Sequence, residues 1–227
     1  MKYHFDWGPI WDNRDLILHG LATTVALCAA ALVLALSIGL VMGTAGAERS
    51  RLLKSLSAGY VELTRNIPLL IHMYFWYLAL AFLRLPAFTC AMLGLAIYSG
   101  AYVTEIVRSG INGITRGQMQ AALATGLTRV QALRLVIYPQ ALRMVAPSLA
   151  GLCSQLIKDS SLASVIAVAE LTYEAGAIEG QTFRTFEAYI TISVLYFVLV
   201  TLVSFCISTA TAHRRERAQV LVPVGEG

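Results

Sequence analysis

The sequence predicts an all-α integral membrane protein with about five transmembrane helices, and three observations lead to that prediction. Of the 227 residues, 57% are hydrophobic and only 13% are charged, whereas soluble domains carry about a quarter charged residues. The apolar residues gather in runs long enough to cross a bilayer, which takes about 20 residues each. The basic residues fall in the loops between those runs, so the net charge of +4 reflects membrane topology rather than nucleic-acid binding.

Five apolar runs are predicted to cross the membrane, after an N-terminal segment at 1–15 and before a tail at 213–227. The first run is too long to be a signal peptide, whose apolar core holds about 7–15 residues. Within it, Gly39 and Gly43 form a small-xxx-small face suited to close helix packing. In the second run Pro68 removes a helical hydrogen bond and predicts a kink or a restart. The five predicted spans cover residues 16–47, 56–83, 88–108, 135–157 and 186–212.

The distribution of positive charge predicts the orientation. The loop at 48–54, the central loop at 109–134 and the tail are rich in Lys and Arg, and five spans place all three on one side. The N-terminal segment and the glutamate-rich loop after the fourth span fall on the other side. Because basic loops stay in the cytoplasm, the sequence predicts an external N-terminus and a cytoplasmic C-terminus.

The central stretch from Thr115 to Pro139 contains two candidate capping boxes. Thr115 is followed three residues later by Gln118, and Thr128 is followed by Gln131. In such a box the hydroxyl caps a free backbone N–H and the Gln side chain reaches back. Gly126 stands just before the second box, where it can end a helix in a left-handed conformation. The pattern predicts two short helices, over 117–125 and 129–137.

The first of these short helices is small and apolar. It offers a surface that another protein could approach closely, formed by Ala121, Ala122, Ala124 and Leu127. The alternative is an amphipathic helix lying on lipid headgroups. The helix has almost no Lys or Arg and no large aromatic residue, so docking of another protein is favoured.

Polar groups within the spans are candidates for function because their burial in lipid is costly unless they are paired. Glu62 with Arg65, and Glu105 with Arg108, have the i,i+3 spacing of one helix face. Pairing within each helix is one reading, and gating or interhelical contact is the other. A second polar group follows the fourth span and could line a substrate path or form a solvated loop. Its members are Lys158, Asp159, Ser160 and Ser161.

Several catalytic motifs are missing from the sequence. No G-x-x-x-x-G-K-[ST] phosphate loop occurs, and neither G-x-S-x-G nor H-E-x-x-H is present. The four cysteines lie singly in apolar stretches, so neither a metal site nor a disulfide framework is expected. We therefore expect a chain that catalyses no covalent reaction.

Four segments in order resemble the permease subunits of bacterial ABC importers, within the polar amino-acid subgroup that includes histidine, glutamine and glutamate permeases. One of them is the central loop, with GQ-x-QAA-x-x-x-G followed by IYPQALR. The resemblance covers nearly the whole chain. The other three segments read YVELTRNIPLL, GAYVTEIVRSGINGITRGQ and LIKDSSLASVIAVAELT.

The resemblance implies a type I transmembrane domain in the bacterial inner membrane, with a periplasmic N-terminal segment. It implies three protein partners: an ATP-binding subunit, a second permease subunit of the same or a sister chain, and an extracytoplasmic amino-acid-binding protein. Membrane lipid surrounds the chain, and no nucleic acid is involved. No cofactor belongs to this chain, since ATP and Mg would sit on the ATP-binding subunit.

In the family, the central loop docks on the ATP-binding subunit and couples its movements to the spans. Two positions depart from the family pattern, because Gln120 stands where Glu is usual and Tyr138 where Leu is usual. The alternatives from the residues alone are a self-sufficient secondary transporter or channel, disfavoured by the lack of an inverted repeat, and a membrane scaffold or sensor. The predicted coupling residues are Gly117, Gln118, Gln120, Ala121, Ala122, Gly126, Leu127 and Pro139.

Overall fold

Long apolar helices run along the length of the molecule in the computed structural model, which describes residues 3–48 and 50–220, with side chains described as far as 209. Among these residues, four helices are long and apolar enough to cross a bilayer. Three are α2 (Arg14–Ala47), α5 (Ala87–Gly113) and α10 (Thr185–Val220). The fourth runs without a break from Arg129 to Ile166 and contains α8 (Tyr138–Asp159). The prediction of an all-helical protein with membrane-spanning helices is confirmed.

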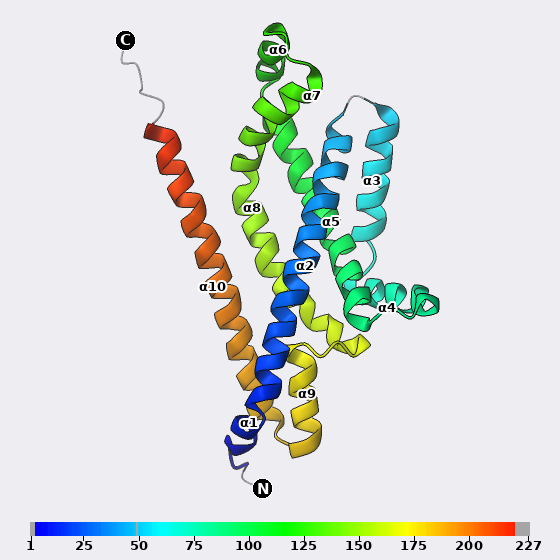
Figure 1. Cartoon of the computed structure of the whole chain (residues 1–227), viewed down its shortest axis with the longest axis vertical. Coiled ribbons are helices and arrows are strands. Elements are labelled where there is room, and N and C mark those ends of the chain that lie inside the picture. The colour runs from blue at the N-terminus through cyan, green and yellow to red at the C-terminus, as the bar shows by residue number, and fades with distance from the viewer. Residues whose placement is uncertain (1–2, 49, 221–227) are drawn as a thin grey trace.

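The second predicted span, 56–83, is divided into two helices. α3 (Arg51–Arg65) follows the long helices, and α4 (Leu69–Ala79) turns across the bundle (Figure 1). Pro68 precedes α4 in an extended conformation with ψ of 141°. Its ring and its missing N–H prevent α3 from continuing. A single 3₁₀ turn, η1 (Ala81–Leu83), then leads towards α5.

Glycines on α2 permit its close packing against α5, which is the most extensive helix contact in the molecule. A Cβ atom on Gly39 would lie 2.2 Å from Val103 Cγ1, and one on Gly43 would lie 2.8 Å from Val107 Cβ. No side chain larger than hydrogen fits at either position without movement. The predicted small-xxx-small face is therefore the α2–α5 interface.

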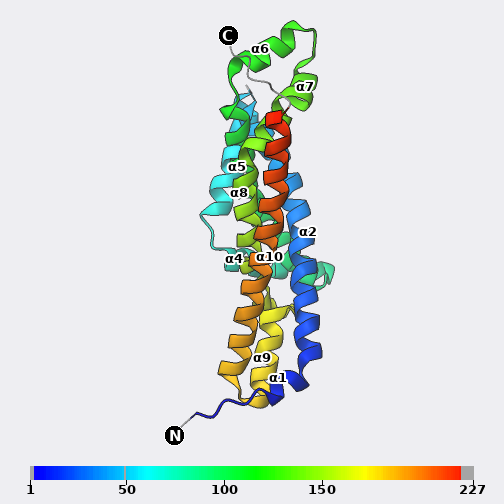
Figure 2. The same ribbon diagram turned by 90° about the vertical axis from the view of Figure 1, so that its left-hand side faces the viewer.

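The two ends of the bundle differ in content. At one end lie α6 (Arg116–Ala124), α7 (Arg129–Ala132), the end of α2 and the start of α3, and α10 also points towards this end (Figures 1 and 2). At the other end lie α1 (Gly8–Asp12) and α9 (Leu171–Thr182). Of the predicted tail, residues 221–227 are outside the described part of the chain, as is Arg49 of the first basic loop.

A buried carboxylate holds the α9 end together. Glu170 is fully buried, and its side chain accepts a hydrogen bond from the Tyr173 N–H at 2.8 Å, which caps α9. It also accepts a hydrogen bond from the hydroxyl of Tyr196 in α10 at 2.6 Å. Burial raises the pKa of Glu170 above the ordinary value for a carboxyl group, against the opposing effect of these hydrogen bonds.

Candidate coupling loop and polar path

The turn between α6 and α7 is a left-handed helix ending. Gly126 has a φ of +86°, a region that glycine enters at no steric cost. Its N–H donates to the Leu123 carbonyl at 3.0 Å, and the Leu127 N–H donates to the Ala122 carbonyl at 3.3 Å. These two bonds form a Schellman motif. The predicted role of Gly126 as the end of the first helix is confirmed.

Of the two predicted capping boxes, only the second forms. The Gln131 N–H donates to the Thr128 hydroxyl at 3.3 Å, and the Thr128 N–H donates to the Gln131 side chain at 2.8 Å. The first box is wrong, because the Thr115 side chain caps nothing. The Gln118 N–H bonds instead to the Thr115 carbonyl at 3.0 Å, so the donor that the hydroxyl would need is already occupied.

The second short helix joins the following span directly. α7 passes through a π-helical turn, η2 (Leu133–Ile137), into α8. Pro139 lies in the first turn of α8 and cannot donate a backbone hydrogen bond. The wider π turn just before Pro139 accommodates a residue that donates no backbone hydrogen bond. Such turns are frequent at functional sites. A movement of α7 would therefore be carried straight into α8.

The helix α6 presents two different faces. Gly117, Ala121 and Ala124 recur at helical spacing and are exposed, and nothing lies within 4 Å of a Cβ built on Gly117. Gln118 is also exposed, whereas Ala122 is buried against the bundle. Gln120 is also exposed and lines a cavity between α6 and the ends of the spans. The exposed face is thus small and uncharged.

Two side-chain contacts tie the loop to the end of α2. Arg129 donates to the Glu48 carboxylate from Nε at 3.1 Å and approaches it with Nη2 at 3.0 Å. The hydroxyls of Tyr138 and Thr44 are 2.6 Å apart. Tyr138, one of the two departures from the family pattern, thereby has a polar partner. Neither contact could be found from the sequence, since no local spacing links residues so far apart.

Three charged residues of the second and third predicted spans, Arg65, Glu105 and Arg108, form one network. The Glu105 carboxylate forms an ion pair with the Arg108 guanidinium at 2.6 Å, as the i,i+3 spacing predicts. Its other oxygen lies 3.7 Å from the guanidinium of Arg65 in α3. The Arg65 guanidinium also stands 4.8 Å from the centre of the Tyr102 ring. The predicted Glu62–Arg65 pair does not form, because Arg65 turns towards α5 while Glu62 stays exposed.

A polar cavity of about 230 Å³ lies between α5 and α8. Its walls include Tyr98, Tyr102, Gln155 and Asp159. The Gln155 amide donates to the Asp159 carboxylate at 2.7 Å, and the two tyrosine hydroxyls are 3.2 Å apart. The cavity therefore offers hydrogen-bond donors and acceptors between two helices that are each long enough to span a membrane.

Of the four polar residues predicted after the fourth span, only Asp159 lines this cavity. The Ser160 hydroxyl is buried and donates to the Ile157 carbonyl at 2.7 Å. The Ser161 hydroxyl donates to the Lys158 carbonyl at the same distance. Lys158 is exposed. Both serines begin a 3₁₀ segment, η3 (Ser160–Ile166), and their hydroxyls satisfy carbonyls in the last turn of α8.

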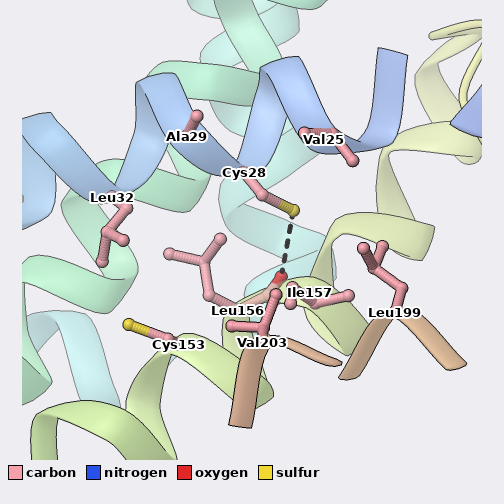
Figure 3. Close-up of a pocket in the computed structure, with 9 residues that line it drawn as sticks. All are labelled: Val25, Cys28, Ala29, Leu32, Cys153, Leu156, Ile157, Leu199 and Val203. Atoms are coloured by element: carbon pink, nitrogen blue, oxygen red, sulfur yellow. Dashed lines mark hydrogen bonds between the residues drawn. The ribbon is translucent and has the colours of Figure 1, made fainter. Parts of the chain in front are cut away.

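A third pocket, of about 170 Å³, is apolar and lies between α2, α8 and α10 (Figure 3). Leu156 and Leu199 point into it, and the thiols of Cys28 and Cys153 are its most polar side-chain groups. The Cys28 thiol already faces the Leu156 carbonyl at 4.0 Å. A polar solute would lose its hydration here without gaining partners.

These features define a helical membrane transport subunit, with a polar cavity between its spans and a small-residue helix exposed at one end. The chain belongs to the family described as the binding-protein-dependent transport system inner membrane component, which matches residues 20–217. This subunit is not itself an enzyme.

Three relatives show the extent of the similarity. The glutamine transport system permease protein GlnP of Escherichia coli strain K12 is 36% identical over 205 residues, covering 88% of this chain and 94% of that protein. The probable glutamine ABC transporter permease protein GlnM of Bacillus subtilis strain 168 is 34% identical over 192 residues, covering 84% and 89%. A solved structure described as an amino acid ABC transporter with histidines matches with a TM-score of 0.83 at 33% identity, covering 93% of this chain and 100% of that one.

Proposed function

We propose that the chain carries an amide-bearing amino acid, in the class of glutamine, across the bacterial inner membrane as one of two permease subunits of an ATP-driven importer. An ATP-binding subunit would dock on the exposed face of α6, and an external binding protein would deliver the amino acid at the α9 end. ATP and Mg would belong to the docked subunit. The observation that carries this proposal is the unbroken helix from Arg129 to Ile166, which joins the loop to the cavity containing Asp159.

The proposed topology has five crossings, with α3 and α4 together forming one broken crossing. It places the N-terminus outside and α6 in the cytoplasm. The basic connection at 48–54 and the central loop lie at the same end of the bundle, which supports this orientation. The acidic α9 region lies at the opposite end.

The proposed substrate path follows one edge of α8. Ser148, Gly151 and Gln155 are exposed at helical spacing and lead towards Asp159. A stripe of small and polar residues in the middle of a span is poorly suited to lipid and suits a water-filled path or a second permease subunit. This stripe supports a path shared between two subunits.

The residues of the cavity support a neutral polar amino acid. The Asp159 carboxylate can accept the substrate ammonium group, and the hydroxyls of Tyr98 and Tyr102 can bind a side-chain amide. A second carboxylate would be repelled by Asp159, which disfavours acidic amino acids. The printed names of GlnP and GlnM, both glutamine permeases, agree with this choice.

The proposed function is tested in proteoliposomes holding the chain with its ATP-binding subunit and external binding protein. We expect uptake of labelled glutamine that requires ATP and the binding protein, and weaker uptake of glutamate. Uptake by the chain alone, driven by an ion gradient, would instead show a secondary transporter. A complex with no uptake of any amino acid and no substrate-stimulated ATP hydrolysis would point to a scaffold or sensor.

A further inference from the structure

A cavity of about 600 Å³ lies beneath the inner face of α6. It is enclosed by the ends of α2 and α5, the start of α3 and the π turn η2. The proposed docking face of α6, with Gly117 and Ala121, points away from it. The transport role therefore leaves this cavity unexplained.

Positive charge predominates on the cavity wall. Lys54, Arg116 and Arg129 line it, and Glu48 is the one carboxylate among the lining residues that the structure describes. Glu48 is held by Arg129 at 3.0 Å. Within the described part of the chain, Lys54 and Arg116 form no ion pair. Gln120 contributes an uncharged amide to the wall. Lys54 and Arg116 therefore have no second carboxylate among the described lining residues.

The inner part of the cavity is apolar. Met119 and Leu123 of α6 face Leu133 and Ile137 of η2 across it, and Ile111 of α5 adds to this wall. A small inorganic anion would leave these side chains uncovered. An amphipathic anion would place its charge on the cations and its hydrocarbon against the apolar wall.

The location also suits an amphipathic ligand. α2 ends at Ala47 and α5 ends at Gly113, so the cavity lies where the apolar spans stop. Phospholipid headgroups occupy this depth of a bilayer. Basic pockets between transmembrane helices bind the headgroups of anionic lipids, and each nearby cation adds to the attraction.

We propose that this cavity binds an anionic phospholipid, with Lys54 and Arg116 on the phosphate and the start of the acyl chains against Met119 and Leu133. The lipid would lie between the coupling loop and the end of α2. The site is additional to the transport function and does not depend on which amino acid is carried.

The test is native mass spectrometry of the purified complex, exchanged into micelles that contain phosphatidylglycerol and phosphatidylcholine in equal amounts. The unmodified complex should retain phosphatidylglycerol preferentially. Lys54→Gln and Arg116→Gln should each lower this preference about fivefold, the usual effect of one cation near an anionic lipid surface. Arg51→Gln is the matched control, since Arg51 is an exposed cation of the same helix as Lys54 that does not line the cavity.

Five results would overturn the proposal. The first is equal retention of the two lipids by the unmodified complex, and the second is an unchanged preference in both cavity variants. The third is an equal loss in Arg51→Gln, which would show general surface charge instead of a site. The fourth is displacement of phosphatidylglycerol by inorganic phosphate alone, which would show a site for free anions. The fifth is a loss of the ATP-binding subunit from the Arg116→Gln complex, which would show that this cation serves the protein contact.

Discussion

Glu48 and Arg129 are 81 residues apart in the sequence, yet the Arg129 guanidinium contacts a single carboxylate oxygen of Glu48 through Nε at 3.1 Å and Nη2 at 3.0 Å. The pair joins the end of α2 to the first turn of α7. Both side chains are partly exposed, so the pair adds at most about 1 kcal/mol to stability. In the proposed mechanism, the pair would make the end of α2 follow the loop that contains α6 and α7.

Reversing this ion pair should weaken coupling more than folding. We expect Glu48→Arg or Arg129→Glu alone to lower uptake per ATP hydrolysed, because like charges would push α2 from α7. The double reversal should recover most of the loss. If each single reversal leaves the ratio of uptake to ATP hydrolysis unchanged in proteoliposomes, α2 is not tied to the loop in this way.

Gly39→Ala should destabilise the chain, because the added Cβ would lie 2.2 Å from Val103 Cγ1. We expect a loss of about 1–3 kcal/mol, as for other overpacked helix contacts, measured as a lower thermal transition in detergent. Gly39→Ala with Val103→Ala should recover part of it. Gly59→Ala is the matched control, since nothing lies within 4 Å of a Cβ at that exposed position. Equal effects of the two alanines would contradict the close α2–α5 packing.

Removing the charge of Asp159 should weaken recognition of the substrate. The carboxylate lines the polar cavity and is oriented by Gln155 at 2.7 Å. A charged hydrogen bond is worth about 1.5–3 kcal/mol, so Asp159→Asn should raise the half-saturating concentration for uptake about tenfold or more. Asp159→Glu, which retains the charge, should be affected less. Unchanged uptake by Asp159→Asn would remove this cavity from the path.

Glu170→Ala should cost about 1–3 kcal/mol of stability, because it removes the cap of α9 and the acceptor for the Tyr196 hydroxyl. Glu170→Gln keeps a side-chain acceptor for the Tyr173 N–H and should cost less. Thermal unfolding of the two variants in detergent distinguishes these effects. Equal losses would show that the side-chain oxygen at this position contributes nothing.

The pH dependence at Glu170 follows from its burial. Because burial raises its pKa in the folded chain, the folded state holds this proton to a higher pH than the unfolded state does. The contribution of Glu170 to stability should therefore be full at low pH and fall as pH rises through the raised pKa. The stability of Glu170→Gln relative to the original chain should increase over the same range, and an opposite trend would contradict the assignment.

Local patterns in the sequence predicted much of the fold. The lengths of the apolar runs predicted the long helices. Gly126 predicted the turn after α6, and Thr128 with Gln131 predicted one helix cap. Each of these features depends only on residues close together in the sequence. Pro68 indicated the break between α3 and α4, although the direction of α4 depends on packing. The Thr115 box failed because a backbone carbonyl occupied the donor that the hydroxyl needed.

Contacts between distant segments could not be predicted. The links of α2 to Arg129 and Tyr138 depend on how the helices pack, as does the turning of Arg65 from Glu62 towards Glu105. The sequence marked Asp159 as a polar candidate, but only the structure separates it from Ser160 and Ser161, whose hydroxyls bond to carbonyls. A single sequence carries no signal for such long-range pairing.

The most direct test of the account is the amount of amino acid imported per ATP hydrolysed when Gly126 is replaced. At a φ of +86°, with no neighbour within 4 Å of a Cβ, replacement strains the backbone and causes no collision. A left-handed conformation costs other residues about 1–2 kcal/mol, while Asn tolerates it well. The account predicts that Gly126→Val complexes still hydrolyse ATP but import much less per ATP, whereas Gly126→Asn complexes stay coupled. An unchanged ratio in Gly126→Val would contradict the coupling role of this loop.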